Sequence, residues 1–545
     1  MKFYSAMLLQ KSVRNPPRPG HEAYRDTPPP ERTLRTLSDP LLGGTHKAGG
    51  GLLASPFAAS AFLLAAAAFI FAAPFASFAE DPPPADNASI VEVIASCQDF
   101  DPQLPWRKRP PQMRSGLGVV VEGNQILTAE NIVRNNTLVE FRRVQSGTKS
   151  EAKVLEADYQ INAALLKTGD TNEESVLKPL PIADKVLRND TVTIVKMDES
   201  GQFQHSNGEV IEVISSAHAL ILKVLTDLSV EKAGTPLLIG DKLAGIVIKY
   251  DKTTQTCLAI AASTLKKFVD DVNTPPYAGS AWAGLFWEPL LDPAKQKYLG
   301  LAAKGGVLVL NTMPGSGAAS VLKPDDVILD WDGCQLDELG YYADPDFGRL
   351  LFSHLVSGRR NPGESASATI LRDRKRQSVQ IPLKRHVDAD QIIPENILGA
   401  RSEYLIEGGL ILRELSGDYL QSAGNDWVML MNARLVHYYF APWQFSSKPG
   451  EHVVILSSVL PDQINVGYQE MRNEVVTAVN GRQARNLADV FAAVDRDGGL
   501  KRITLMGYGV DLVLDENEIA PANRRIAANY RIPSLRYQRG SAGTK

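Results

Sequence analysis

Between about residue 90 and residue 272, apolar residues gather in short runs rich in Val, Ile and Leu, separated by Gly, Asn and Asp. Runs of this kind are typical of strands, and several at close spacing favour an all-β sandwich or barrel. One further segment, residues 263–272, has the spacing of a helix and closes the region. The predicted strands lie in GLGVVVEGNQILTA, TLVEFRRV, DTVTIVKM, EVIEVI, ALILKVL, DKLAGIVIKY and CLAIAA.

The second half of the chain contains an internal repeat. Residues 305–333 and 452–481 each give an apolar strand, a proline (Pro314 or Pro461), a small helical segment and a second strand that closes on a DG or NG turn. So many matched features predict two copies of one domain. A candidate helix follows each copy, within DPDFGRLLFSHLVSG in the first and NLADVFAAVD in the second.

The N-terminal part reads as a targeting segment. Residues 48–79 carry no charge, and the apolar run 57–73 is short for a membrane span of about 20 residues. The run is followed by Ser77-Phe78-Ala79, the small-x-small pattern of a signal-peptidase site. We therefore expect a periplasmic or otherwise exported protein. An uncleaved membrane anchor and a two-part plastid leader are the alternatives.

Length and charge narrow the class of protein. A chain of 545 residues is too long for one core and predicts three folded units. The net charge of -4 argues against a nucleic-acid partner, which needs a concentrated basic surface. The short basic patch Arg107-Lys108-Arg109 is expected to be a solvated edge.

The cysteines point to no metal site and no cofactor. Cys97, Cys257 and Cys334 are an odd number, so at most one disulfide can form within the chain. No CxxC or clustered Cys/His pattern is present in the sequence. We expect all three to be structural or free thiols.

Four blocks in sequence order resemble the HtrA/Deg family of exported or organellar serine proteases. They are DFDPQLPWRKRP, RSGLGVVVEGNQILTAENIV, AKVLEADYQINAALLK and GTPLLIGDKLAGIVI. The resemblance implies a mainly β fold: a trypsin-like double β-barrel followed by two PDZ domains. It divides the chain into a targeting region (1–79), a linker (80–89), a protease-like domain (90–272), a first PDZ (278–386), a second, atypical PDZ (400–520) and a tail (521–545).

The same blocks imply that the catalytic triad is degenerate. Asn131 stands at the family's histidine position, Asn162 at its aspartate position and Ala233 at its serine position. Asparagine has no imidazole-like basicity near neutral pH, and alanine has no nucleophilic atom. The chain also has no histidine between Glu80 and Gln204, where the first barrel would have to supply it. We therefore predict no catalytic residue.

We expect no other side chain to replace a triad residue. We expect His205 to be an exposed residue at a hairpin tip, His218 to pack within a strand, and Thr235 to lack a base. Ser229 precedes the turn in which a nucleophile would lie, and the charge of Glu231 would oppose an oxyanion. The pair Asp325-Asp326 is expected to be a solvated loop, with no metal or acid/base role.

The resemblance implies that the first PDZ binds peptides. Its carboxylate-binding loop and strand would be Trp282-Ala283-Gly284-Leu285-Phe286, with backbone N–H groups holding a terminal carboxylate and Leu285 and Phe286 lining a pocket. The alternative is that Trp282 and Phe286 fill the domain core. In the second PDZ, Glu407 would repel a carboxylate, so this unit is expected to pack internally or against another subunit.

We expect a non-catalytic pseudoprotease that binds unfolded proteins or C-terminal peptides as a chaperone, scaffold or regulator of active Deg-type proteases. The resemblance also implies a homo-oligomer, a trimer or a multiple of it. The alternatives are an active serine endopeptidase of the HtrA/Deg type in protein quality control and an oligomer-building structural partner that binds no free peptide.

Overall fold

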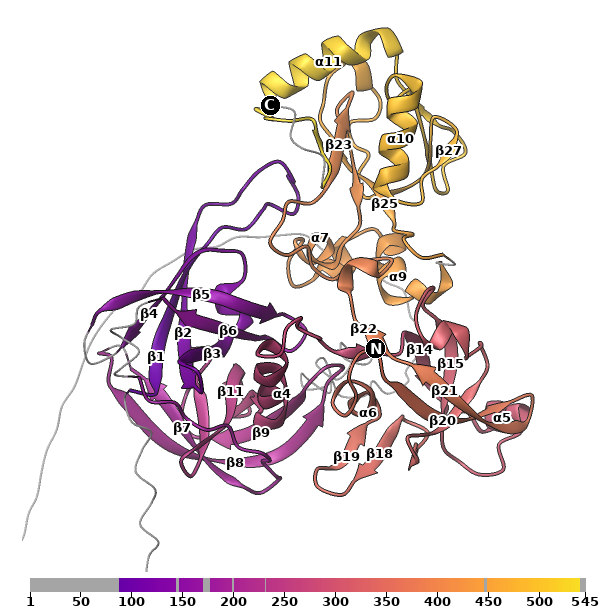
Figure 1. Ribbon diagram of the computed structural model, residues 1–545. Helices are drawn as coiled ribbons and strands as arrows, with labels where there is room; N and C mark the ends of the chain where they lie inside the picture. Colours follow the sequence, from indigo (N-terminus) through magenta and orange to yellow (C-terminus); the bar gives the residue numbers. More distant parts are fainter. Residues whose placement is uncertain are drawn as a thin grey trace, which may run out of the picture. The chain divides into compact units, whose positions relative to one another are not determined.

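The computed structural model describes residues 88–143, 147–169, 177–198, 200–230, 232–445 and 448–539 (Figure 1). The predicted targeting region, most of the predicted linker and Glu231 lie outside the described residues.

Two closed six-stranded barrels form the first part of the described chain (Figure 1). All seven predicted strand segments lie in them, because each offers an apolar face to a barrel interior. The first barrel comprises β1 (Ile90–Cys97), β2 (Gln112–Val121), β3 (Gln125–Ala129), β4 (Asn136–Arg143), β5 (Lys149–Asp158) and β6 (Ala163–Thr168). The second comprises β7 (Thr191–Met197), β8 (Phe203–Ser215), β9 (Leu220–Thr226), β10 (Pro236–Ile239), β11 (Lys242–Asp251) and β12 (Thr256–Ala261).

One hydrophobic cluster joins the two barrels. Ile90 and Leu117 of the first barrel pack in it with Leu238 and Ile246 of the second, and all four are almost fully buried. The predicted helix is α4 (Ala262–Val272), which adds Leu265 and Phe268 to this cluster. The fold is therefore the double barrel that the sequence predicts.

The first PDZ unit follows as an antiparallel sheet in the order β14-β15-β16-β20-β21, with β17 paired to β16. The bounds of its elements are β13 (Ala281–Trp282), β14 (Leu285–Pro289), α5 (Pro293–Leu299), β15 (Val307–Thr312), η1 (Ala318–Ser320), β16 (Val327–Trp331), β17 (Cys334–Gln335), β18 (Tyr341–Asp344), β19 (Gly348–Leu351), α6 (Ser353–Ser357), β20 (Ser365–Arg372), β21 (Lys375–Pro382) and β22 (Lys384–Arg385).

The helix predicted over residues 344–358 is mostly wrong. This stretch continues the β18–β19 hairpin, and helix forms only over α6. The Asp344 side chain accepts the N–H groups of Asp346 and Phe347, both at 3.0 Å, and so sets a turn where the helix would begin. Leu350 is buried from the extended backbone of β19 and Phe352 from the turn before α6, a pattern that helical spacing can imitate.

The second PDZ unit repeats this plan, which confirms the internal repeat: β25 and β26 match β15 and β16, with a short 3-10 turn between them. Its elements are β23 (Tyr404–Glu407), β24 (Leu410–Glu414), α7 (Gly417–Gln421), α8 (Trp427–Leu430), α9 (Ala433–Phe440), η3 (Pro442–Gln444), β25 (Val454–Val459), η4 (Gln463–Asn465), β26 (Glu474–Val479), β27 (Arg482–Gln483), α10 (Leu487–Asp497), β28 (Arg502–Leu505), β29 (Leu512–Val513), α11 (Glu516–Asn529) and β30 (Arg536–Tyr537).

Residues predicted as a tail are part of this second unit. Helix α11 runs beyond residue 520 and buries Ala522 and Ile526. After it, β30 pairs antiparallel with β23, placing Tyr537 opposite Tyr404. The predicted helix after the second repeat is α10, which buries Phe491 against the sheet. Figure 1 draws α10 and α11 towards the yellow end of the colour range.

The pair Asp325-Asp326 is only half solvated, contrary to expectation. Asp325 is exposed, but Asp326 is 1% exposed and forms two hydrogen bonds with Arg372, from Nε at 2.7 Å and Nη2 at 2.6 Å. Arg372 also donates to the Val321 carbonyl at 2.8 Å. The ion pair therefore ties β20 to the turn that precedes β16.

We predict that Asp326→Asn lowers the free energy of unfolding of the first PDZ unit by about 2–4 kcal/mol, because it leaves the partly buried Arg372 without its counter-charge. Asp325→Asn is the matched control. Its exposed side chain and φ of 69° suit asparagine, so the expected change is within about 0.5 kcal/mol. Urea unfolding measures both, and equal effects of the two variants would contradict the assignment.

Candidate functional site

The positions that resemblance assigns to the triad come from three separate elements. Asn131 lies in the short helix α2 (Glu130–Val133), directly after β3. Asn162 lies in the turn between β5 and β6, and Ala233 lies in the loop before β10. Each sits at a strand end or in a loop, where a barrel presents side chains for chemistry.

Asn162 holds the start of α2. Its side-chain oxygen Oδ1 accepts the backbone N–H of Asn131 at 3.0 Å, and its carbonyl accepts the N–H of Glu130 at 3.2 Å. The backbone of Asn162 has a φ of 55°, a left-handed conformation that asparagine tolerates better than most residues. Asn162 therefore has a structural role that needs no histidine.

Gly116 brings Ala233 close to α2. A Cβ atom at Gly116 would lie 2.2 Å from Cδ1 of Ile132 and 2.6 Å from the carbonyl oxygen of Ala233. The Leu117 N–H also donates to that carbonyl at 2.9 Å. Ile132 follows Asn131 in the chain, so the Ala233 loop lies beside α2, whose start is held by Asn162.

The two alternative hydroxyls differ in their access to solvent. The Thr235 side chain is 1% exposed, and its Oγ1 donates to the Lys232 carbonyl at 2.7 Å. Ser229 is half-buried in the loop after β9, outside the turn formed by Ala233 and Gly234. Oxygen nucleophiles need access and an adjacent base, and Thr235 has no access.

The two histidines of the second barrel lie elsewhere than predicted. His205 is exposed, but it lies on β8 opposite Val195 and not at a hairpin tip. His218 is packed as expected, but in the turn between β8 and β9. Its ring centroid is 5.0 Å from that of His386, its Nδ1 is buried with no hydrogen-bond partner among the described residues, and burial lowers its pKa to about 4. His218 is therefore neutral at pH 7.

A group of charged side chains beside Ala233 escaped the sequence analysis. Glu92 is 5% exposed; its Oε1 accepts from Lys232 Nζ at 3.0 Å, and its Oε2 accepts from Arg142 Nε at 3.0 Å. Burial raises the pKa of Glu92, but the bonds from both cations outweigh it and hold the pKa below its usual value. The signal was a glutamate inside the apolar strand IVEVIASC. This contact fixes the Ala233 loop to the first barrel.

The conformation of the predicted peptide-binding loop is fixed by Gly284 and by hydrogen bonds. Gly284 has a φ of 74°, and a Cβ there would lie 2.1 Å from the Cβ of Ser316. The Gly284 carbonyl accepts from the Met313 N–H at 2.8 Å and from Ser316 Oγ at 3.1 Å, while the Ala283 carbonyl accepts from Ala318 at 2.9 Å. Only glycine fits at residue 284, so a larger side chain would disturb the fold itself.

Leu285 and Phe286 do not line one pocket as predicted. They are neighbours on β14, so their side chains point to opposite faces. Leu285 packs against the core cluster, whereas the Phe286 ring lies 5.7 Å from the ring of Trp443 in η3. The aromatic residue of β14 that enters the core is Trp287, which is 8% exposed. The alternative of Phe286 as a core residue is therefore wrong as well.

Trp282 contacts the end of the first PDZ unit and not its core. Its ring meets that of His386 edge-on at 5.1 Å, just after β22, which pairs with β13. Strand β14 pairs with β15 on one side and is the edge strand of its sheet. An edge strand next to a glycine loop is the geometry that strand addition requires.

The second PDZ unit lacks this open edge. Strand β24 pairs with β25 on one side and with β23 on the other, through a tight turn at Gly408 and Gly409. Glu407 directs its carboxylate to the Leu500 N–H, which donates to Oε2 at 2.9 Å, and burial raises the pKa of Glu407. Both observations favour the expected internal packing of this unit.

Cys97, Cys257 and Cys334 are free thiols, and the first two are buried. Within the described residues, no cluster of three or more His, Cys, Asp or Glu could hold a metal ion. None of the helices in the described part of the chain has the length and apolar character needed to cross a membrane.

Residues 393–538 match the family model of the PDZ domain, a range that includes α11 and β30. The chain is 27% identical over 462 residues to Protease Do-like 2, chloroplastic, of Arabidopsis thaliana, covering 82% of this chain and 74% of that protein. It is 24% identical over 458 residues to Protease Do-like 4, mitochondrial, of the same plant, covering 80% and 84%.

Among solved structures, the HtrA-type protease AlgW with decapeptide is similar to 55% of this chain over 96% of its own length, with 16% identity and a TM-score of 0.44. The serine endoprotease from Yersinia pestis gives 18% identity and a TM-score of 0.40, covering 55% of this chain and 95% of that one. Two closed barrels, a PDZ match and Do-like relatives along four-fifths of its length together support assignment of the chain to the HtrA/Deg family.

Proposed function

We propose that this chain is a non-catalytic member of the HtrA/Deg family that binds peptide segments or C-termini through its first PDZ unit. It would act as a chaperone, a scaffold or a regulator of active relatives. In this role the double barrel is a structural platform, and recognition is the activity that remains.

The observation that carries this proposal is the composition of the three positions that resemblance assigns to the triad. An amide at residue 131, a second amide at residue 162 and a methyl group at residue 233 offer no proton acceptor and no nucleophile. The Asn162 oxygen is already bonded to a backbone N–H. Active triads depend on a base that is oriented by a carboxylate and bonded to a hydroxyl, so three replacements at once support loss of catalysis.

The first PDZ unit supports the binding half of the proposal. Its edge strand β14 can accept an extended peptide as an added strand, and the left-handed Gly284 loop lies at the start of that strand. Leu285 is half-buried beside the core cluster, where an apolar last side chain of a peptide could contact it.

Compartment and partners are parts of the same proposal. We infer an exported or organellar location from the uncharged N-terminal run, and the names of the two relatives, one chloroplastic and one mitochondrial, favour an organelle. The partners would be unfolded proteins, free C-termini and active Deg-type proteases. A homo-oligomer is also part of the proposal, on family resemblance alone.

The rival function is an active serine endopeptidase in protein quality control. The relatives' names, which contain the word protease, favour it. It would require a nucleophile outside these three positions, for which Ser229 and Thr235 are the candidates that the sequence offers.

We predict that a serine-directed fluorophosphonate leaves the folded full-length protein unlabelled. We also predict that unfolded casein is cleaved at least about a thousandfold more slowly than by an active trypsin-like enzyme, because triad loss costs that much or more. In-gel labelling and casein fluorescence measure the two effects. Casein cleavage that disappears in Ser229→Ala or Thr235→Ala would establish the rival function.

Peptide binding is predicted to need the free carboxylate. A fluorescent peptide with an apolar C-terminal residue should bind at least about tenfold more tightly than its C-terminal amide, since amidation removes the charge that backbone N–H groups hold. Leu285→Ala should weaken the free-acid peptide by roughly three- to tenfold through lost apolar contact.

Leu291→Ala is the matched control, because Leu291 follows β14 and is 55% exposed. Fluorescence anisotropy on the full-length protein measures four affinities: those of the acid and the amide peptide for wild-type protein, and those of the acid peptide for the Leu285→Ala and Leu291→Ala variants. Equal affinities of the acid and the amide, or equal effects of the two leucine variants, would rule out β14 and its loop as the receptor.

A further inference from the structure

Residues 99–110, here called the strap, connect β1 to β2 and fold on themselves. The Asp101 N–H donates to the Arg107 carbonyl at 2.8 Å, and the Arg109 N–H donates to the Asp99 carbonyl at 2.9 Å. At the tip, the Arg107 N–H donates to the Leu104 carbonyl at 2.8 Å. These bonds fold the strap into a small hairpin.

The tip inserts Trp106 into the second PDZ unit. Trp106 is 8% exposed and meets the Tyr404 ring edge-on at 6.2 Å. Tyr404 and Ile406 alternate on β23 with Leu405, which faces the PDZ core, so they form the opposite face of that strand. The socket, as we call this cluster, is completed by Ile411, Leu460, Ala522, Ile526 and Ile532.

A buried cation donates a hydrogen bond to the backbone of the strap. Arg413 is fully buried, and its guanidinium donates to the Pro102 carbonyl and, at 3.1 Å, to Ser402 Oγ. Its Cζ also lies 4.7 Å from the centroid of the Tyr419 ring. Buried polar groups are costly without acceptors, so removal of the strap would deprive Arg413 of one acceptor.

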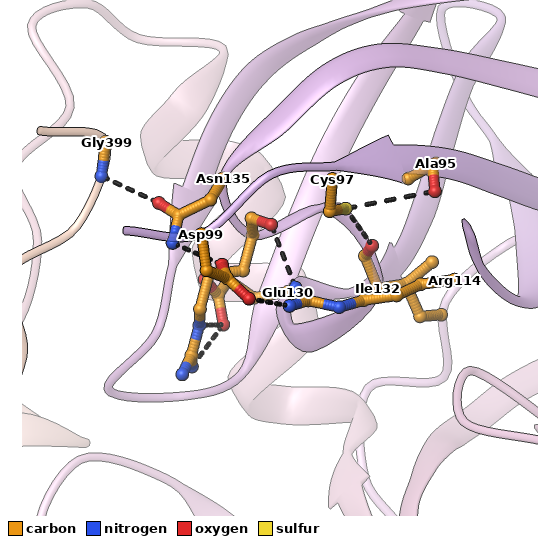
Figure 2. A network of polar contacts seen from close by, with 9 residues as sticks. Ala95, Cys97, Asp99, Arg114, Glu130, Ile132, Asn135 and Gly399 are labelled. Carbon is orange, nitrogen blue, oxygen red and sulfur yellow. Dashed lines mark hydrogen bonds and ion pairs between the residues drawn. The ribbon is translucent and has the colours of Figure 1, made fainter. Parts of the chain in front are cut away.

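The base of the strap is bonded as well (Figure 2). Asp99 accepts from Arg114 Nη2 at 2.6 Å and from Asn135 Nδ2 at 2.7 Å. The Asn135 side-chain oxygen in turn accepts the N–H of Gly399 at 2.8 Å, in the segment that leads into the second PDZ unit. Arg114 Nη1 also donates to the carbonyl of Arg134, next to α2.

We propose that the socket is a binding site for a Leu-Pro-Trp segment held in a turn and that the chain's own strap is its resident ligand. The recognition elements are an indole in an apolar cluster and a backbone carbonyl on a buried guanidinium. The strap thereby fixes the second PDZ unit to the first barrel in cis. The proposal holds whether or not the barrel cleaves peptides.

This site is distinct from the edge at which a PDZ fold takes a C-terminal peptide. The strand that would offer that edge, β24, is already paired on both sides. The socket uses the outer face of β23 together with α11, and it holds an internal segment with no terminal carboxylate. The second PDZ unit therefore keeps a binding role with a different ligand class.

Tryptic cleavage of the strap tests the proposal on the full-length protein. Arg107 and Lys108 are exposed, so trypsin can reach their side chains. The rate of cleavage after them then depends on how often the surrounding backbone opens to enter the protease. Trp106→Ala should accelerate cleavage after both residues by about tenfold or more, and Trp106→Phe should give an intermediate rate. The matched control is Met113→Ala, which removes an apolar side chain that is 64% exposed on β2. Mass spectrometry follows the two sites.

A trans experiment identifies the ligand. A fluorescent peptide of residues 99–110 with blocked ends should bind the full-length Trp106→Ala protein, whose socket is vacant, and bind wild-type protein at least about tenfold more weakly. The same peptide carrying Trp106→Ala should not bind. Circular dichroism confirms that the protein variants are folded.

Three results would overturn the proposal. The first is a cleavage rate of Trp106→Ala equal to that of Met113→Ala. The second is equal peptide binding by wild-type and Trp106→Ala protein, which would place the peptide elsewhere. The third is protection of the wild-type strap from trypsin that disappears when the protein is diluted, which would mean that the strap in the socket comes from a second copy.

Discussion

The arrangement of the double barrel depends on a close backbone contact between its halves. Gly234 has a φ of 79°, and a Cβ there would lie 2.0 Å from the Leu117 carbonyl oxygen, while the Leu117 N–H bonds the carbonyl of Ala233. No side chain beyond hydrogen fits at residue 234, and the Lys232–Glu92 ion pair holds the same loop. This contact places Ala233 beside α2 and β2. Because it is made by backbone atoms, it does not depend on which side chains occupy the triad positions.

Much of the fold could be predicted because its strands alternate or run apolar over short lengths. The internal repeat also predicted two related units, since matched prolines and turn glycines leave few alternatives. The hairpin of β18 and β19 could not be predicted from spacing. Leu350, Phe352 and Leu355 satisfy helical and extended patterns alike, and the deciding bonds come from Asp344.

The order of the family-like blocks along the chain pointed to residues 131, 162 and 233 as the candidate site, but it could not give the contacts of these residues. The sequence could not reveal that Phe286 faces Trp443, since its partner lies in another unit. The role of Trp106 was missed because the basic residues that follow it dominate the composition of the strap. A tryptophan between proline and a charged run in a loop was the available signal.

The open edge of β14 has a consequence for solubility. In the second unit, β24 corresponds to β14 and is paired on both sides, with β25 and with β23, while β30 pairs with β23. An unpaired edge strand is a template for pairing between chains, which natural sheets usually cover or interrupt. Crowding of unoccupied molecules would therefore favour edge-to-edge aggregation through the first unit. A bound peptide would pair with this edge and block pairing between molecules. The protein would therefore resist aggregation better when its peptide ligands are abundant.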